Sequence, residues 1–212
     1  MLFKLLKLTL ILGLVFPIFA SANEIILKKE NFLKLVAPAV DKVYLELDAK
    51  YKLLKSHIDN NDTNNLLVEK YMKKYKATNH QDLLQRIKPH PKSVALAQAA
   101  MESGWATSRF TKVANNLFGV WSFNKNEPRV PASQKRGNKT VYVKKYASVD
   151  ESIRDYYKVL ATGRAFNEFR AQKMRSEDPY KLVKKLDKYS EKGAEYGKEL
   201  TQVIKYNKFY NY

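Results

Sequence analysis

A single acidic side chain lies within an otherwise apolar helical segment. The segment 93–109 reads SVALAQAAMESGWATSR, and its apolar residues cover almost the whole circumference of a helix. Glu102 shares a face with Gln98, one turn before it, and with Trp105, three residues after it. Burial among apolar neighbours raises the pKa of a carboxyl, because it disfavours the charged form. Glu102 is therefore a candidate general acid, and a buried acid satisfied by hydrogen bonds or an ion pair is the alternative.

Other catalytic chemistries have little support in the composition. The chain has no Cys, which excludes disulfides, thiol catalysis and Cys-ligated zinc. Its three His residues, His57, His80 and His90, are too far apart in sequence to form a helical metal-binding pair. We therefore expect no metal and no cofactor.

The segment after Glu102 changes from helical to strand-like patterning. Residues 114–119 (ANNLFG) predict a turn, and residues 120–123 predict a strand. The polar stretch 124–139 is interpreted as a long loop, and the β-favouring residues of 140–146 predict a second strand. These segments together predict a small antiparallel hairpin.

Helical patterning dominates the rest of the chain. Apolar residues recur at helical spacing in 30–56, where Pro38 is expected to separate a short helix from a longer one. The predicted fold class is α+β, mainly α: a lysozyme-like helical bundle with a small β-hairpin lobe and additional N-terminal helices. A bundle of this kind, with one acid at a helix end before a hairpin, suits glycosidases, which need a carboxylic acid to protonate the glycosidic oxygen.

The first residues have the layout of a secretory signal peptide. Lys4 and Lys7 precede an apolar run that is short for a membrane span, and Ala20-Ser21-Ala22 is a small-x-small cleavage site. An uncleaved anchor is the alternative. We expect cleavage after Ala22, export to the periplasm or cell envelope or full secretion, and no stable membrane span afterwards. The expected organisation is a signal peptide (1–22), an N-terminal helical support region (23–88) and a catalytic domain (89–212).

The charge of the chain is strongly positive. Lys and Arg number 39 against 21 acidic residues, which gives a net charge of +18. A positive field attracts polyanions, including nucleic acid, anionic lipid and anionic cell-wall polymers. Export makes nucleic acid a poor partner, and the Lys residues are spread along the chain rather than clustered. A solvated basic surface without a dedicated partner is the alternative.

Two motifs carry a family resemblance. The run LAQAAMESGW (96–105) followed by NNLFG (115–119) resembles the N-acetylglucosaminidases of glycoside hydrolase family 73, which includes flagellar-rod and autolysin-type glucosaminidase domains. TSRF (107–110) and YSEKG (189–193) resemble the Bax-type branch of that family in particular. The resemblance covers about residues 90 to 208.

The resemblance implies an activity and a set of site residues. It implies hydrolysis of the β-1,4 bond between N-acetylglucosamine and N-acetylmuramic acid in peptidoglycan glycan strands, by a monomeric enzyme with Glu102 as general acid. It also implies that Tyr189 lines the cleft near the acid and acts in catalysis. The expected substrate-binding residues are Gln98, Trp105, Asn116, Trp121, Tyr146 and Tyr196.

The second catalytic group is left open by the sequence. Glu127 is the one acidic residue between Phe118 and Tyr146, and it lies beside Pro128 in a predicted loop rather than on a strand. It is the candidate second carboxylate, and a surface position is the alternative. Without it, the substrate N-acetyl group or a water held by other groups would assist, and the choice between inversion and retention stays open. A lytic transglycosylase of the same fold and a non-catalytic wall-binding module are the competing functions.

Overall fold

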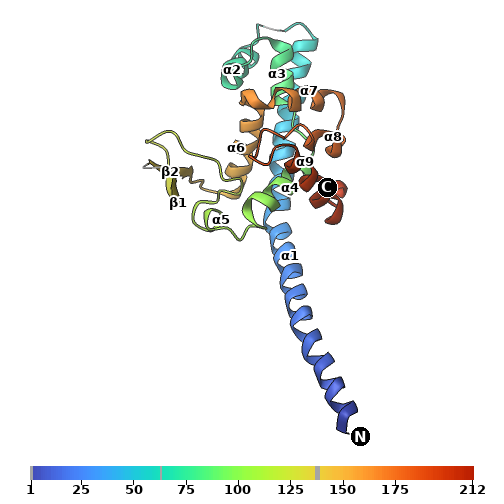
Figure 1. Ribbon diagram of the computed structural model, residues 1–212. Helices are drawn as coiled ribbons and strands as arrows, with labels where there is room; N and C mark the ends of the chain where they lie inside the picture. The colour runs from blue at the N-terminus through green and yellow to red at the C-terminus, as the bar shows by residue number, and fades with distance from the viewer. Residues whose placement is uncertain (1, 63, 137–138) are drawn as a thin grey trace.

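The computed structural model describes residues 2–62, 64–136 and 139–212, with side-chain environments from residue 22 onward except for 63 and 133–139. Helices occupy most of the chain (Figure 1). The first group is α1 (Leu2–Asp59), α2 (Leu66–Tyr75), α3 (His80–Ile87), α4 (Lys92–Ser103) and α5 (Arg109–Ala114). The strands β1 (Arg129–Arg136) and β2 (Lys139–Lys144) follow. The chain ends with α6 (Val149–Thr162), the 3₁₀ turn η1 (Arg164–Phe166), α7 (Asn167–Arg175), α8 (Pro179–Val183), α9 (Ala194–Tyr206) and the 3₁₀ turn η2 (Phe209–Asn211).

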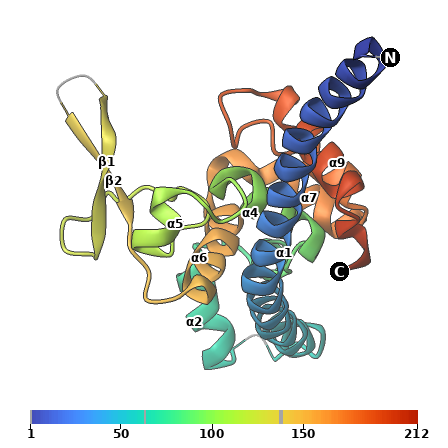
Figure 2. The ribbon, with the colours of Figure 1, turned by 90° about the horizontal axis from the view of Figure 1, so that it is seen from below.

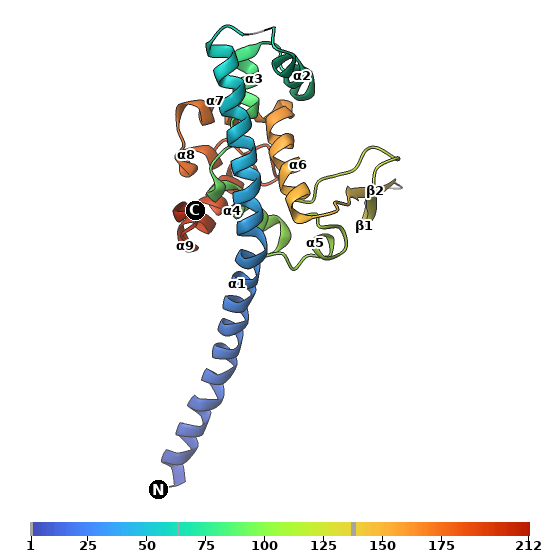
Figure 3. The ribbon, with the colours of Figure 1, turned by 180° about the vertical axis from the view of Figure 1, so that it is seen from behind.

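Helix α1 runs along the whole body and extends beyond it as a rod toward the N-terminus (Figures 1 and 3). The predicted break at Pro38 is wrong, because α1 is continuous from Leu2 to Asp59. The Pro38 side chain is exposed, whereas Val36 and Val40 on either side of it are buried in the core. This packing offsets the one backbone hydrogen bond that a proline removes from a helix interior. Within the described part of the chain, no helix is long and apolar enough to cross a membrane.

Helix α4 is the centre of the fold. It contacts α1, α8 and α9, and nearly all of its side chains from Ser93 to Ala100 are buried. The small Ala side chains of α4 allow these neighbours to approach closely, because they fill little space between the helix axes. The core is continuous from Phe32 on α1 to Phe209 near the C-terminus. It therefore crosses residue 88, where the sequence placed the boundary between support region and catalytic domain.

The β-hairpin projects from one side of the helical body, on the side of α1 opposite to α9 (Figure 2). Its strands pair antiparallel, Arg129 opposite Lys144 and Val130 opposite Val143, with a register shift between Pro131 and Lys135. The hairpin itself is confirmed, but its first strand is β1, which the sequence analysis interpreted as loop. The predicted strand 120–123 contributes one isolated bridge, from Trp121 to Val143. β1 contains Pro131, which is tolerated in an edge strand, and its largely polar composition resembles that of a loop.

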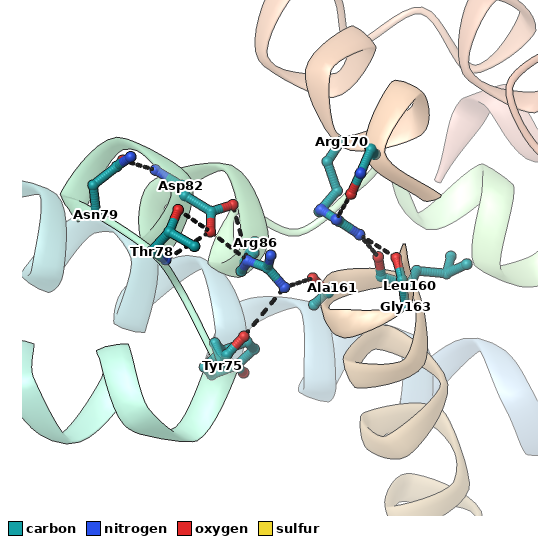
Figure 4. A network of polar contacts seen from close by, with 10 residues as sticks. Tyr75, Thr78, Asn79, Asp82, Arg86, Leu160, Ala161, Gly163 and Arg170 are labelled. Carbon is teal, nitrogen blue, oxygen red and sulfur yellow. Dashed lines mark hydrogen bonds and ion pairs between the residues drawn. The ribbon is translucent and has the colours of Figure 1, made fainter. Parts of the chain in front are cut away.

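A polar network joins α3 to the C-terminal helices (Figure 4). The Arg86 guanidinium donates to both carboxylate oxygens of Asp82 at 2.9 Å and to the carbonyl of Ala161 at 3.4 Å. Arg170 donates to the carbonyls of Leu160 (2.9 Å) and Gly163 (2.8 Å) at the end of α6. Both cations therefore satisfy carbonyls at the C-terminal end of α6, where cations are favourable.

Two buried titratable residues, Lys173 and His90, lie close to this network. Lys173 is 4% exposed, and its ammonium donates to the carbonyl of Lys88. Burial, with the charges of Arg170 and Lys88, lowers the pKa of Lys173 to about 7. His90 is 1% exposed and its ring stacks on Tyr157 at 4.3 Å, and burial lowers its pKa to about 3. Both groups therefore favour the neutral form in the folded protein.

The lowered pKa of Lys173 predicts a pH dependence of stability. In the unfolded chain Lys173 binds a proton up to its ordinary pKa of 10.5, whereas the folded protein releases it near pH 7. Stability from this group is therefore lowest below pH 7 and rises as the pH increases toward 10. We expect Lys173→Met to raise the melting temperature at pH 6 by several degrees, and this gain to shrink between pH 7 and pH 10. The measurement is thermal unfolding across pH, with Lys181→Met, an exposed lysine on α8, as the control. A gain that does not vary with pH would contradict the prediction.

Candidate active site

A cavity of about 680 Å³ lies between the end of α4 and the hairpin lobe. Glu102 lines it from α4, and Tyr189 lines it from the segment between α8 and α9. Glu127 and Trp121 line it from the loop before β1, and Lys144 from the end of β2. The remaining lining residues are Phe118, Gly119, Val120, Phe123, Asn124, Val159 and Phe166. One wall thus comes from the helical body and the other from the hairpin lobe.

Glu102 is held by a chain of hydrogen bonds from three helices. Tyr156 on α6 donates to Gln98 Oε1 at 2.6 Å, and Gln98 Nε2 donates to the Tyr196 hydroxyl at 3.0 Å. The Tyr196 hydroxyl, on α9, then donates to Glu102 Oε1 at 2.6 Å. Each donor points toward Glu102, so the bonds polarise one another in the same direction. The chain fixes the orientation of the carboxyl and occupies Oε1, which leaves Oε2 as the site for a proton.

The surroundings of Glu102 raise its pKa. Burial is the largest cause, and the hydrogen bond from Tyr196 and the positive charge of Lys192 oppose it. Burial also raises the pKa of Tyr196, and the nearby Glu102 carboxylate adds to the shift. A phenol with a raised pKa stays neutral and remains a donor at every pH at which the protein is folded. Glu102 thus has the environment of a carboxyl that holds its proton to a higher pH than an ordinary glutamate, as a general acid requires.

The turn after Glu102 is strained. The helix ends at Ser103, rather than continuing to Arg109 as the sequence predicted, and Gly104, Trp105 and Ala106 all have positive φ (57°, 64° and 61°). Left-handed conformations cost about 1–2 kcal/mol for each residue other than Gly. The Ser103 hydroxyl accepts from the Ala106 N–H at 2.7 Å, and the Trp105 ring packs edge-on against Phe32 of α1 at 5.3 Å. These contacts hold the turn in place.

Trp105 therefore has a different position from the one expected. It packs against α1 and the C-terminal turn, and the cavity that it lines is a separate hollow shared with Leu27 and Asn31 of α1. The structure does not bring it to the cavity of Glu102. Its place in the strained turn makes it an anchor for the end of α4.

Asn116 fastens the hairpin lobe to the body. Its amide nitrogen donates to the carbonyls of Val120 (3.1 Å) and Lys144 (2.9 Å), and its amide oxygen accepts from the Val120 N–H at 3.0 Å. Asn116 is 1% exposed and is not among the residues that line the cavity of Glu102, and its described hydrogen bonds are structural. Gly119, with φ of 63°, then turns the chain in a conformation that other residues rarely adopt.

Three more of the expected substrate-binding residues lie off the cavity wall. Gln98 has no exposed surface, because its amide is enclosed in the hydrogen-bond chain between Tyr156 and Tyr196. Tyr196 is 2% exposed and touches Glu102 rather than open space. Tyr146 is 9% exposed, and its hydroxyl donates to Asp155 at 2.7 Å. Gln98 and Tyr196 thus support Glu102 from within the core, and Tyr146 bonds to Asp155 of α6.

Glu127 is a second carboxylate in the same cavity as Glu102. It lies in a loop, as the sequence predicted. Its Oε1 accepts from the Ser122 hydroxyl at 2.7 Å, and its Oε2 is 4.0 Å from the ammonium of Lys144. Lys144 also pairs with Asp155 of α6 at 2.9 Å, which connects the end of β2 to the helical body. Glu127 therefore has a fixed orientation on the wall opposite the helical body.

Tyr189 lines the cavity beside Glu102 without a hydrogen bond to it. Its ring stacks on Tyr196 with centroids 5.6 Å apart and planes at 8°, and it contacts Phe166 at 6.0 Å. Burial and the nearby Glu102 charge raise the pKa of Tyr189, so its hydroxyl remains a neutral donor. Stacking thus places this phenol next to the acid.

The structure brings together Glu102, Trp121, Glu127 and Tyr189 from the set expected on sequence, and it adds lining residues that the sequence did not indicate. Phe123 and Lys144 are the clearest of these, one 85% exposed and the other at the end of β2. In the sequence, the available signal for Phe123 was a second aromatic residue two positions after Trp121. Among the described residues, no group of three or more His, Cys, Asp or Glu side chains is placed to hold a metal ion.

A lysozyme-like helical body, a hairpin lobe and a cavity with two carboxylates between them define a glycoside hydrolase. The chain belongs to the glucosaminidase family: residues 77–209, more than half of its length, match the family described as mannosyl-glycoprotein endo-beta-N-acetylglucosaminidase.

Individual relatives agree with this family. The chain is 32% identical over 124 residues to Protein bax from Escherichia coli (strain K12), a match that covers 56% of this chain and 43% of that protein. The chain thus matches less than half of the length of this curated relative. A peptidoglycan hydrolase mutant from Sphingomonas sp. A1 has a similar fold, with a TM-score of 0.50, 16% identity and coverage of 85% and 96% of the two chains. The catalytic domain of the autolysin Auto from Listeria monocytogenes aligns with a TM-score of 0.48, 20% identity and coverage of 81% and 85%.

The hydrogen-bond chain predicts the effect of removing its last donor. Tyr196→Phe deletes the hydroxyl that stabilises the ionised form of Glu102, so we expect the pKa of Glu102 to rise further. The measurement is a carboxyl ¹³C NMR titration of protein labelled at Glu. Tyr189→Phe is the matched control, because that ring lies on the same cavity without a hydrogen bond to Glu102, and we expect it to change the pKa less. An unchanged pKa in Tyr196→Phe would show that the hydroxyl does not act on the carboxyl.

Proposed function

We propose that the protein is an exported endo-β-N-acetylglucosaminidase that hydrolyses the β-1,4 bond between N-acetylglucosamine and N-acetylmuramic acid in peptidoglycan. The observation that carries this proposal is the pairing of a carboxyl of raised pKa, Glu102, with a second carboxylate, Glu127, in one cavity. Glycoside hydrolysis generally uses two such groups on either side of the scissile bond. The names of its structural relatives, an autolysin and a peptidoglycan hydrolase, support the choice of substrate.

In the proposed mechanism Glu102 is the general acid. The glycosidic oxygen accepts the proton from Glu102 Oε2, while Tyr196 continues to donate to Oε1. The glycosidic bond breaks as positive charge develops at the anomeric carbon, and the two carboxyl groups face that charge. Glu127, whose Oε1 accepts from the Ser122 hydroxyl, takes a proton from the water as the water oxygen bonds to the anomeric carbon. Tyr189 donates a hydrogen bond to the substrate beside the acid.

The positive charge and the N-terminal sequence support an envelope location. Peptidoglycan carries carboxylates on its stem peptides, so a chain with a net charge of +18 is attracted to it. Residues 1–22 have the layout of a cleaved export signal, which would bring the enzyme to this substrate.

The experiment that tests the function is the analysis of digestion products. Purified peptidoglycan is treated with the protein, and the new ends are identified by mass spectrometry. New reducing ends at N-acetylglucosamine support the proposal. Anhydromuramic ends would assign the protein to the lytic transglycosylases, and the absence of new ends would leave it as a wall-binding module.

Replacing the acid should abolish most of the activity. Glu102→Gln keeps the size of the side chain but cannot donate a carboxylic proton, so we expect the turnover number to fall by about 10²- to 10⁴-fold with little change in melting temperature. Glu69→Gln, an exposed position on α2, is the control for the loss of one negative charge. Turnover retained in Glu102→Gln would remove Glu102 from this role.

Replacing the second carboxylate gives an independent test. Glu127→Gln should lower turnover by about 10²- to 10⁴-fold, because the amide cannot accept a proton from water. Ser122→Ala removes the hydrogen bond to Glu127 while leaving the carboxylate in place, so a smaller loss is expected. Full turnover in Glu127→Gln would mean that the substrate N-acetyl group or another residue assists the reaction.

The cavity phenol should matter to turnover and not to stability. Tyr189→Phe removes one oriented donor at the cavity, and such a donor contributes about 10²- to 10³-fold when it acts on the transition state. Tyr206→Phe, at a position 78% exposed, is the control. Activity and melting temperature are measured together, and a loss of activity that tracks a lower melting temperature would make Tyr189 a structural residue.

A further inference from the structure

A second hollow lies against the hairpin lobe, next to the catalytic cavity. Its volume is about 840 Å³, compared with about 680 Å³ for the cavity of Glu102. It is lined by Trp121, Ser122, Phe123, Lys125, Arg129, Thr140, Val141 and Tyr142. This is the size of a pocket that holds a sizeable ligand, and the catalytic steps proposed above do not use it.

Two aromatic rings separate the hollow from the catalytic cavity. Trp121 and Phe123 line both spaces, with ring centroids 6.1 Å apart and planes tilted by 49°. Trp121 is 40% exposed and Phe123 is 85% exposed. A glycan chain that packs the apolar faces of its sugars on these rings continues from one space into the other. One extended substrate could therefore occupy both cavities.

The two spaces carry opposite charges. The catalytic cavity contains Glu102 and Glu127 beside one cation, Lys144. Among the described residues, those that line the hollow include Lys125 and Arg129, and none of them is acidic. The Arg129 guanidinium lies 4.0 Å from the centre of the Tyr142 ring, which restrains it in the wall of the hollow. Arg is suited to bind carboxylates, because its planar group donates two parallel hydrogen bonds.

We propose that this hollow binds the carboxylate-bearing peptide substituent of the glycan chain, while the sugars pack on Trp121 and Phe123. The inference rests on the proposed function and adds the part of the substrate that the catalytic cavity does not reach. A peptide joined to a muramic acid residue carries free carboxylates, which Lys125 and Arg129 would pair with. The enzyme then prefers glycan strands that still carry their peptides.

The experiment compares two substrates with the full-length protein. One is purified glycan strands that carry stem peptides, and the other is the same strands after enzymatic removal of the peptides. We expect the KM for the peptide-bearing strands to be about 2- to 30-fold lower, as two partly exposed ion pairs would give, with a similar kcat. The difference should shrink at high salt, because exposed ion pairs are screened.

A double variant assigns the preference to the hollow. Lys125→Gln with Arg129→Gln should raise the KM for peptide-bearing strands to the value for stripped strands, without changing kcat. Lys145→Gln is the matched control, because it removes one exposed positive charge from the same lobe outside both cavities. Arg129→Lys, which keeps the charge, should retain part of the preference, and melting temperatures show that the hairpin is folded.

The outcomes separate this inference from the proposed function. If the protein hydrolyses both substrates with the same KM, or if the double variant keeps the preference, then the hollow does not bind the peptide and the inference is overturned while the function stands. If the protein hydrolyses neither substrate, the proposed function fails and the inference fails with it.

Discussion

The site depends on one carboxyl at the end of α4 whose orientation is set by neutral hydrogen-bond donors. Tyr156, Gln98 and Tyr196 come from α6, α4 and α9, and their hydrogen bonds all point toward Glu102. A buried amide or hydroxyl without a partner would cost about 1–3 kcal/mol. This cost favours the packing of α6 and α9 on α4 in which every link of the chain is made. The same requirement that satisfies the core thus positions the acid. Desolvation at this position raises the pKa of Glu102, although the hydrogen bond from Tyr196 and the positive charge of Lys192 act in the opposite direction.

The other wall of the cavity is held by a different kind of contact. Asn116 joins the loop and β2 through their backbone groups. Backbone contacts do not depend on neighbouring side chains, so the lobe can vary its surface while Glu127 stays opposite Glu102. The helical body therefore positions the acid, whereas the lobe carries the second carboxylate and the exposed aromatic rings.

Local patterns in the sequence predicted the helical body and the acid, because a carboxylate in an Ala-rich, apolar helix is visible within a few residues. Tyr196 could not be assigned to Glu102 in this way, since the two are 94 positions apart and meet only through the packing of α9 on α4. The strand β1 was missed because its polar residues and Pro131 give it a loop-like composition. Pro38 was taken as a break because local propensity says nothing of the core that holds α1 together. Burial likewise separated Gln98 and Asn116, which support the site, from residues that face the cavity.

The packing of α1 against the turn after Glu102 affects how much of the chain is needed for a stable catalytic domain. The family match begins at residue 77, yet Phe32 packs on Trp105, and Val36, Val40 and Val43 fill the core beside α4. The strained turn at Trp105 is thus braced by a helix outside the matched region. An excised fragment that follows the family boundary would lose this brace and expose an apolar trough along α4. The smallest autonomous unit of this hydrolase is therefore larger than the segment that the family match covers.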